Sequence, residues 1–259
     1  MLSLASGIAP VLIDSVVHVG AGGAQETALY DHLGLEVLWI DAREDVCESL
    51  NDKLLGLVKQ SSVCAVLGSK SSRDWFFHCN TGGRFSSTYD LADIPKLYPG
   101  VSVSKIESVQ KRVLPDVLRE RGFDVQSNTC LVISALGNTL EILQGCGSFL
   151  HKFGCIRVKV ADFETHNWSS DVCIVASFLE REGFRLSGPV LISPASRVDI
   201  AMKRILLHKN PPACIRELLE SQQFMLDILP DQVSESGCIY DAFFFRGDRV
   251  DTRLQRVEF

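Results

Sequence analysis

Short apolar runs alternate along the chain with segments in which apolar residues recur at helical spacing. Runs of strand length occupy residues 16–19, 36–40, 129–134 and 155–161, and the segment 45–59 places Val46, Leu50, Leu54 and Leu57 on one helical face. Parallel strands require crossover connections, and right-handed crossovers place helices on both faces of the sheet. The pattern therefore predicts an α/β fold with a doubly wound, mostly parallel sheet.

The same pattern predicts the remaining elements. We expect further helices over residues 25–33, 111–121, 139–143 and 172–182, and further strands over residues 62–67, 74–79, 184–186 and 241–246. Pro115 is expected in the first turn of its helix, where a missing amide hydrogen costs least. The last strand is expected to close the sheet in antiparallel orientation. No segment rich in Gly, Ser or Pro divides the chain, so we expect one domain over residues 1–259, with an irregular elaboration at about 187–235.

Composition narrows the range of partners. The chain has 259 residues, of which 46% are hydrophobic and 22% charged, as in an ordinary globular protein. A net charge of -6 gives no general attraction to phosphate backbones or anionic lipid, so neither nucleic acid nor a membrane is an expected partner. We interpret the basic pairs Lys111-Arg112 and Lys203-Arg204 as solvated helix faces. No apolar stretch reaches the roughly 18 residues of a membrane span.

The nine cysteines form no C-x-x-C pair, so their spacing supports neither a zinc site nor a redox motif, and we expect no metal. Several lie inside apolar runs, where a free thiol behaves as a small hydrophobic side chain. This usage is typical of a reducing compartment, and we expect the protein in the cytoplasm.

A candidate cofactor site follows the first two strands. Gly20 and Gly22 come directly after the first strand, where residues without Cβ allow backbone amides to approach a ligand. Asp41 ends the second strand, where a carboxylate can accept hydrogen bonds from both hydroxyls of a ribose. The same pair would serve an adenosyl cofactor or a nicotinamide dinucleotide. The dinucleotide motif G-x-G-x-x-G is incomplete here, because Gln25 occupies its sixth position.

The order of these motifs resembles the FkbM family of methyltransferases. The matching positions are Val19-Gly20-Ala21, Glu26 and Tyr30 in the next helix, Trp39-Ile40-Asp41-Ala42, Ser86-Ser87, and the long segment LVISALGNTLEILQG over residues 131–145. The resemblance covers residues 16–186 and implies a class I methyltransferase fold with S-adenosylmethionine as cofactor. It also implies O-methylation of a hydroxyl on a sugar or small metabolite. The cofactor-binding residues that we expect are Gly20, Ala21, Gly22, Glu26, Asp41 and Ser134.

Three positions depart from the family pattern. Ser134 stands where the family has an acidic residue, Leu136 where it has Gln or Glu, and Thr139 where it has Glu. A serine hydroxyl can neither hold an ammonium group nor act as a base as strongly as a carboxylate. A second hypothesis is therefore a methyltransferase-like module without catalysis that serves binding or assembly, and a third is an NAD-dependent oxidoreductase.

The candidate bases lie near predicted strand ends. They are His18, Asp162, Glu164 and His166, of which we predict Asp162 and His166 as catalytic because they follow the strand at 155–161. The structural alternative is that Asp162 or Thr165 caps the next helix, and that His166 packs on the surface. For His18 the alternative is a core histidine whose ring is satisfied by the backbone.

Overall fold

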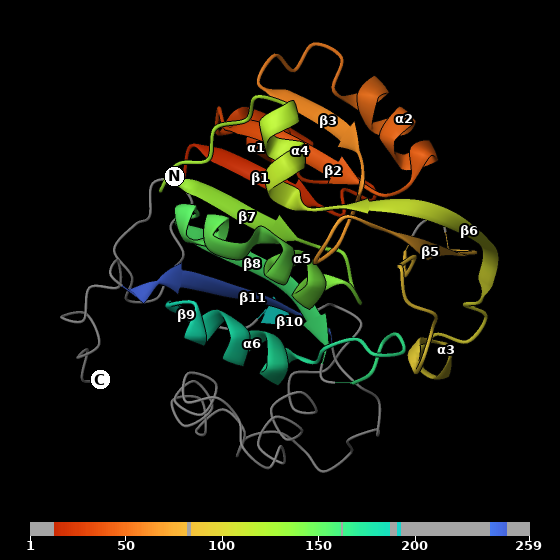
Figure 1. Ribbon diagram of the computed structural model, residues 1–259. Helices are drawn as coiled ribbons and strands as arrows, with labels where there is room; N and C mark the ends of the chain where they lie inside the picture. The colour runs from red at the N-terminus through yellow and green to blue at the C-terminus, as the bar shows by residue number, and fades with distance from the viewer. Residues whose placement is uncertain (1–12, 82–83, 162, 187–190, 193–238, 248–259) are drawn as a thin grey trace, which may run out of the picture.

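The computed structural model describes residues 13–81, 84–161, 163–186, 191–192 and 239–247. Its main sheet has eight strands: β1 (Ser15–Val19), β2 (Glu36–Asp41), β3 (Gln60–Cys64), β7 (Thr129–Ile133), β8 (Cys155–Ala161), β9 (Phe184–Leu186), β10 (Leu191–Ile192) and β11 (Ile239–Arg246). Their order is β10-β11-β8-β7-β1-β2-β3, and β9 also pairs with β11 (Figure 1). The five strands from β3 to β8 are parallel, and β11 is antiparallel to β8. The predicted fold class, including the closing antiparallel strand, is confirmed.

Helices cover both faces of this sheet. Those described are α1 (Thr27–His32), α2 (Glu44–Lys53), α3 (Ile94–Leu97), α4 (Leu114–Glu120), α5 (Thr139–Cys146) and α6 (Val172–Arg181), with a 3-10 turn at Gly147–Lys152. The helices α4, α5 and α6 lie in front of the sheet in Figure 1, and their apolar side chains share one core with Val17, Leu38 and Leu131. On the opposite face, Tyr30 of α1 and Leu50 of α2 pack with the fully buried Trp39. The sheet is therefore the middle of three layers.

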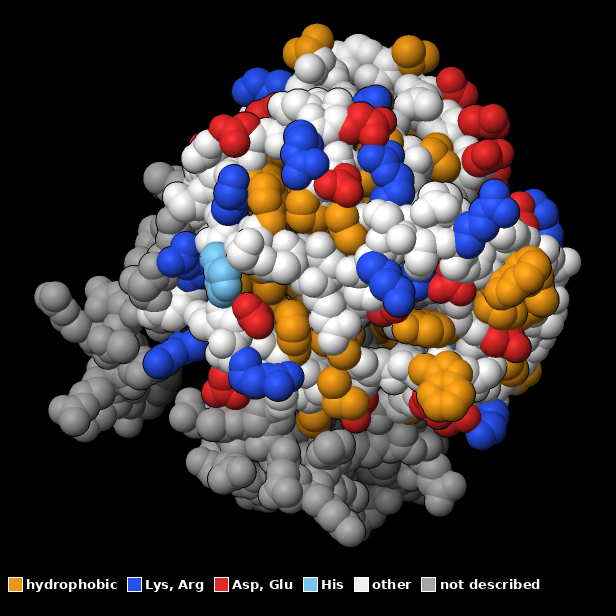
Figure 2. Space-filling view, viewed as in Figure 1, with side chains coloured by type: hydrophobic (Ala, Val, Ile, Leu, Met, Phe, Trp, Pro, Cys, Tyr) orange, Lys and Arg blue, Asp and Glu red, His pale blue; other side chains and the backbone are white. Residues whose placement is uncertain are grey.

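A second, three-stranded sheet stands beside the carboxyl ends of the main strands. It consists of β4 (Val66–Leu67), β5 (Ser72–Cys79) and β6 (Val103–Arg112), in the order β4-β6-β5. The predicted single strand at 62–67 is wrong, because the chain leaves the main sheet after Cys64 and enters the second sheet at Val66. This sheet lies at the right of the view in Figure 1 and forms a wall next to the strand ends. Figure 2, in the same orientation, shows charged side chains of both signs on this part of the surface.

The predicted helix over 111–121 begins three residues late. Lys111 and Arg112 end β6, and Pro115 lies in the first turn of α4, as its missing amide hydrogen requires. The interpretation of Lys111-Arg112 as a solvated helix face is wrong, since Lys111 is 4% exposed and pairs with Asp74 and Glu141.

Two sequence predictions lie largely outside the described residues. The elaboration expected at about 187–235 is described only at β10, so the single-domain prediction remains a prediction. Lys203 and Arg204 also lie outside. In the described part of the chain, no helix is long and apolar enough to cross a membrane. The seven cysteines in that part are free thiols.

Candidate functional site

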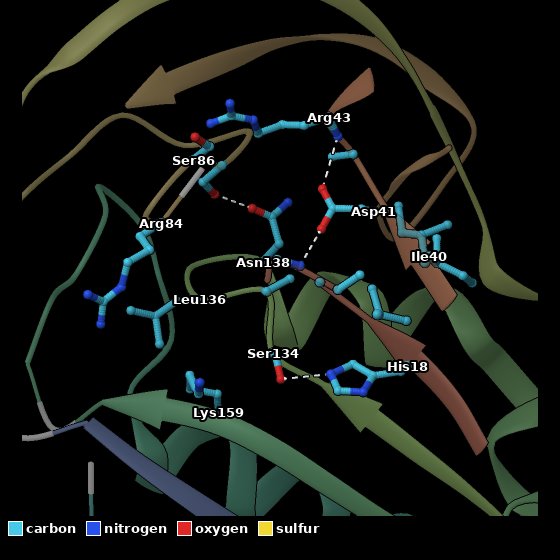
Figure 3. A pocket seen from close by; sticks show the side chains of 18 of the residues that line it. His18, Ile40, Asp41, Arg43, Arg84, Ser86, Ser134, Leu136, Asn138 and Lys159 are labelled. Carbon is cyan, nitrogen blue, oxygen red and sulfur yellow. Dashed lines mark hydrogen bonds between the residues drawn. The ribbon is translucent and has the colours of Figure 1, made fainter. Parts of the chain in front are cut away.

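A cavity of about 580 Å³ opens at the carboxyl ends of the parallel strands. The register aligns Ile40, Val19, Ile133 and Val158 on β2, β1, β7 and β8, so the next residue of each strand lies at the same edge. These next residues are Asp41, Gly20, Ser134 and Lys159, and all four line the cavity (Figure 3). Ligands of open α/β sheets bind at this edge.

The glycine corner after β1 approaches the next strand at backbone distance. Gly20 has a φ of +81°, and its amide donates to the Ile40 carbonyl at 2.8 Å. A Cβ at Gly20 would lie 2.8 Å from the Ala135 nitrogen, so no side chain fits there without displacing that backbone. At Gly22, with a φ of +49°, a Cβ would meet no atom within 4 Å, so the space beside it is open.

Asp41 closes this corner with its carboxylate. Gly22 donates its amide to Asp41 Oδ2 and Arg43 donates its amide to Oδ1, each at 3.0 Å. Burial raises the pKa of Asp41, and the two amides act in the opposite direction. Each oxygen keeps a second lone pair, so the carboxylate can still accept hydrogen bonds from a ligand. The glycine corner and Asp41 converge, as the sequence predicts.

Ser134 and His18 form the floor of the cavity. The His18 Nε2 lies 3.3 Å from Ser134 Oγ, its Nδ1 lies 3.3 Å from the Tyr30 hydroxyl, and its ring stacks on Trp39 with centroids 4.6 Å apart. Burial, with the positive charges of Arg157 and Lys159, lowers the pKa of His18 to about 3. The imidazole is therefore neutral near neutral pH. His18 is therefore a core histidine. Its ring nitrogens contact side chains, whereas the alternative given in the sequence analysis expected backbone partners.

The loop after β5 forms the wall opposite the strand ends. Ser87 and Thr88 both hydrogen-bond to the side chain of Asn138, and the Asn138 Nδ2 donates to Thr88 Oγ1 at 2.5 Å. Asn138 is 6% exposed and directly precedes α5. This contact fixes the loop, with the Ser86-Ser87 pair of the resemblance, against the end of β7. The loop thus contributes Ser86, Ser87 and Thr88 to the lining of the cavity.

Two further predicted cofactor-binding residues, Ala21 and Glu26, also line the cavity. Ala21 is buried in the corner, and Glu26 lies at the amino end of α1 without capping it through its side chain. The Glu26 carboxylate instead faces Arg157, with Oε1 3.8 Å from its nearest guanidinium nitrogen. All six predicted cofactor-binding residues therefore line one cavity, although their contact with a cofactor remains a prediction.

Of the two predicted catalytic residues, the structure describes one, His166. Asp162 lies outside the described residues. His166 is fully buried, its Nε2 donates to the Phe85 carbonyl at 2.8 Å, and its Nδ1 lies 3.0 Å from Thr165 Oγ1. Burial lowers the pKa of His166, and the ring is not among the cavity-lining groups. In this structure His166 therefore binds the loop that contains Phe85 through this hydrogen bond.

Sequence reasoning did not predict several polar residues of the lining, among them Arg43, Arg84, Asn138 and Lys159. The sequence did contain an indication that Lys159 lines the site, because it is a charged residue inside the apolar run 155–161 and lies at the edge of the sheet where a ligand is expected. Arg84 belongs to a loop whose course no spacing rule fixes.

Comparison with known proteins finds structural similarity and no family. No family model and no curated protein matches the chain. Among solved structures, it is similar to precorrin-6y C5,15-methyltransferase from Geobacter metallireducens GS-15, with 10% identity over 93% of this chain and 85% of that one at a TM-score of 0.41. It is also similar to a geranyl diphosphate methyltransferase in complex with SAM, with 10% identity over 95% and 81% of the two chains at a TM-score of 0.43. A SAM-dependent methyltransferase from Geobacter sulfurreducens in complex with S-adenosyl-L-homocysteine gives 8% identity over 94% of both chains at 0.42. Similarity at this level identifies no family, and the resemblance to FkbM proteins stays a prediction.

Proposed function

We propose that this chain is an S-adenosylmethionine-dependent methyltransferase that methylates a hydroxyl of a sugar or small metabolite. One observation carries the proposal. The Gly22 amide and the Asp41 carboxylate meet at 3.0 Å on the rim of a cavity at the switch edge of a doubly wound sheet.

The described lining provides groups suited to each part of this cofactor. Asp41 offers free lone pairs to ribose hydroxyls, and the neighbouring Ala65, Val66 and Leu67 offer an apolar surface for a purine. The open space at Gly22 leaves room for the chain that follows the ribose. When bound, the cofactor supplies an activated methyl group on a sulfonium. The protein then needs chiefly to place an acceptor oxygen in line with it.

Glu26 favours this cofactor over a dinucleotide. Its carboxylate lines the cavity beside the glycine corner, where a Rossmann dehydrogenase would receive a diphosphate. A carboxylate there repels a diphosphate, whereas it attracts the ammonium and sulfonium groups of S-adenosylmethionine. The NAD-dependent oxidoreductase is therefore the weaker alternative.

Proton removal from the acceptor is the least developed part of the described site. Both nitrogens of His18 and of His166 have partners, and the Asp41 oxygens each hold an amide. Asp162, which follows β8 directly in the chain, stays our candidate for the base. In the proposed reaction an acceptor oxygen lone pair bonds to the methyl carbon, the carbon–sulfur bond electrons remain on sulfur, and the hydroxyl proton leaves to the base or to water.

Calorimetric titration tests the cofactor assignment. We expect S-adenosylhomocysteine and S-adenosylmethionine to bind and NADH not to bind. We expect Asp41→Ala to weaken the binding about tenfold or more, because it removes charged acceptors of ribose hydroxyls. Asp52→Ala is the matched control, since Asp52 is exposed and lies outside the lining. Binding of NADH alone, or cofactor binding that Asp41→Ala leaves unchanged, would reject the proposal, provided that thermal unfolding shows both variants to be folded.

The module without catalysis remains a second candidate because of one observation. Ser134 replaces the acidic residue of the resemblance, and its hydroxyl is within hydrogen-bonding distance of a neutral His18. Transfer of a radiolabelled methyl group to any member of a panel of hydroxyl compounds would exclude this candidate. Cofactor binding without transfer to any of them would favour it.

A further inference from the structure

Three of the charged side chains that line the cavity lie on two different sides of it. Asp41 and the glycine corner lie on one side, and Lys159 and Arg84 lie on the other, with Leu136 near both of them (Figure 3). His18 and Ser134 lie on the floor of the cavity. A ligand that reaches across the cavity therefore meets negative charge at one end and positive charge at the other.

Lys159 lacks a carboxylate partner within the described residues. Its register neighbour on β11 is Asp241, but the Asp241 carboxylate pairs with Arg157 at 3.3 Å. Arg157 is also the cation that faces Glu26. The Asp241 carboxylate is thus paired with another residue, and the half-buried side chain of Lys159 lines the cavity.

Arg84 has the same property in the described part of the chain. Its guanidinium lies 5.8 Å from the centre of the Phe85 ring, and no carboxylate of a described residue pairs with it. The third cation of the lining, Arg43, differs because it pairs with Asp45. Among the described lining residues, the cations that remain available to a ligand are therefore Lys159 and Arg84.

The position of Lys159 places this pair beyond the proposed cofactor. Asp41, Gly20, Ser134 and Lys159 lie on four adjacent strands. Neighbouring strands lie about 4.8 Å apart, so the backbone of Lys159 is roughly 14 Å from the backbone of Asp41, and the backbone of Ser134 is roughly 10 Å from it. A cofactor held from Asp41 across the glycine corner to Ser134 leaves the Lys159 end of the cavity for the acceptor.

We propose that Lys159 and Arg84 bind a carboxylate or phosphate group of the acceptor, which makes the substrate an anionic hydroxyl compound. This inference rests on the proposed function. A guanidinium and an ammonium are the side chains that bind such anions most strongly in a partly desolvated site. Leu136 and Phe85, which also line this end, supply an apolar contact for the carbon skeleton.

Binding to the protein saturated with S-adenosylhomocysteine tests the inference at low ionic strength, where charge pairs are least screened. The probes are two matched pairs, glycerol with glycerol phosphate and glucose with glucuronate. Titration calorimetry is the first readout. Transfer of a radiolabelled methyl group from S-adenosylmethionine to the same probes is the second. We expect each anion to bind about tenfold or more tightly than its neutral counterpart. The phosphate pair and the carboxylate pair distinguish the two anionic groups.

The variants Lys159→Met and Arg84→Gln should each remove most of this preference and leave the affinity for S-adenosylhomocysteine within about twofold. Lys70→Met and Arg73→Gln are matched controls, because both residues are exposed and lie outside the lining. Equal or absent binding of anionic and neutral probes by the wild type overturns the inference. So does a loss of S-adenosylhomocysteine affinity in Lys159→Met, since the cation would then serve the cofactor. Failure of the cofactor to bind the wild type is a different result, and it overturns the proposed function itself.

Discussion

At the residue scale, Gly20 shows how closely the glycine corner depends on the absence of a side chain. Its positive φ disfavours other residues, and the carbonyl carbon of Ser134 and the nitrogen of Ala135 lie within 2.9 Å of a Cβ built there. The corner is therefore held against the end of β7 by backbone contact. A change at Gly20 moves the same strand end that presents Ser134 to the cavity.

Gly20→Ala should destabilise the protein more than a positive φ alone explains. Gly56→Ala is the control, since Gly56 has a φ of +88° and open space around its Cβ position. We expect about 1–2 kcal/mol from the backbone strain in the control, and about 1–3 kcal/mol more for Gly20→Ala from overlap with Ala135. Urea unfolding measures both values. Equal losses in the two variants would show that the β7 end yields without cost.

The residues that sequence could place are those at strand ends. Gly20, Gly22 and Asp41 follow from apolar runs and their terminators, because the carboxyl ends of parallel strands meet at one edge. The positions of Arg84 and Asn138 in the cavity could not be predicted in this way, since they depend on how the loop after β5 folds over the end of β7. His166 is the opposite case. It follows a strand in the chain, but the chain turns its ring toward the Phe85 carbonyl and away from the cavity lining.

At the scale of elements, β6 is the strand that hydrophobic pattern could not predict. Half of its ten residues are exposed and one is buried, so alternation of apolar and polar side chains does not mark it. The element is held at its end by Lys111, whose Nζ lies 2.6 Å from Asp74 Oδ2 on β5 and 3.1 Å from Glu141 Oε2 on α5. One ammonium thus joins the second sheet to a helix of the main layer.

Lys111→Met should weaken the attachment of the second sheet. We expect a loss of about 1–3 kcal/mol, less than for a fully buried pair because both carboxylates keep contact with water. Lys105→Met is the control on the same strand, where the exposed pair with Glu107 should contribute below about 1 kcal/mol. Urea unfolding at neutral pH compares them. A loss no greater than that of the control would mean that Lys111 contributes only as packing.

At the scale of the whole molecule, the three-layer architecture was predictable because it depends on repeated alternation, which many residues specify together. The second sheet was not, because its strands β4 and β6 are defined by pairing between residues distant in the chain. The polar floor of the cavity has a similar origin. His18 lies in β1, the middle one of the five parallel strands, and its neutral state follows from how α1 and β2 enclose it.

This enclosure predicts that the protein loses stability in mild acid. The folded pKa of His18 is about 3, below its ordinary 6.5, so the unfolded chain binds a proton that the folded protein refuses. Stability is therefore full above pH 6.5 and falls as pH drops toward 3. Between pH 7.5 and 5.5 the expected loss is about 1.4 kcal/mol from His18, and His166, whose pKa is also lowered by burial, adds to it in the same direction.

The variant His18→Phe isolates this contribution whatever its absolute stability. The aromatic ring can keep the stack on Trp39, and the difference in unfolding free energy between pH 7.5 and 5.5 should shrink by about 1.4 kcal/mol. His32→Phe, at the exposed end of α1, is the control and should leave the difference unchanged. An undiminished pH dependence in His18→Phe would mean that His18 takes up a proton in the folded protein. Below about pH 6.5 the ring would then be mostly cationic beside Ser134, and the floor of the cavity would repel a sulfonium that the proposed function requires it to accept.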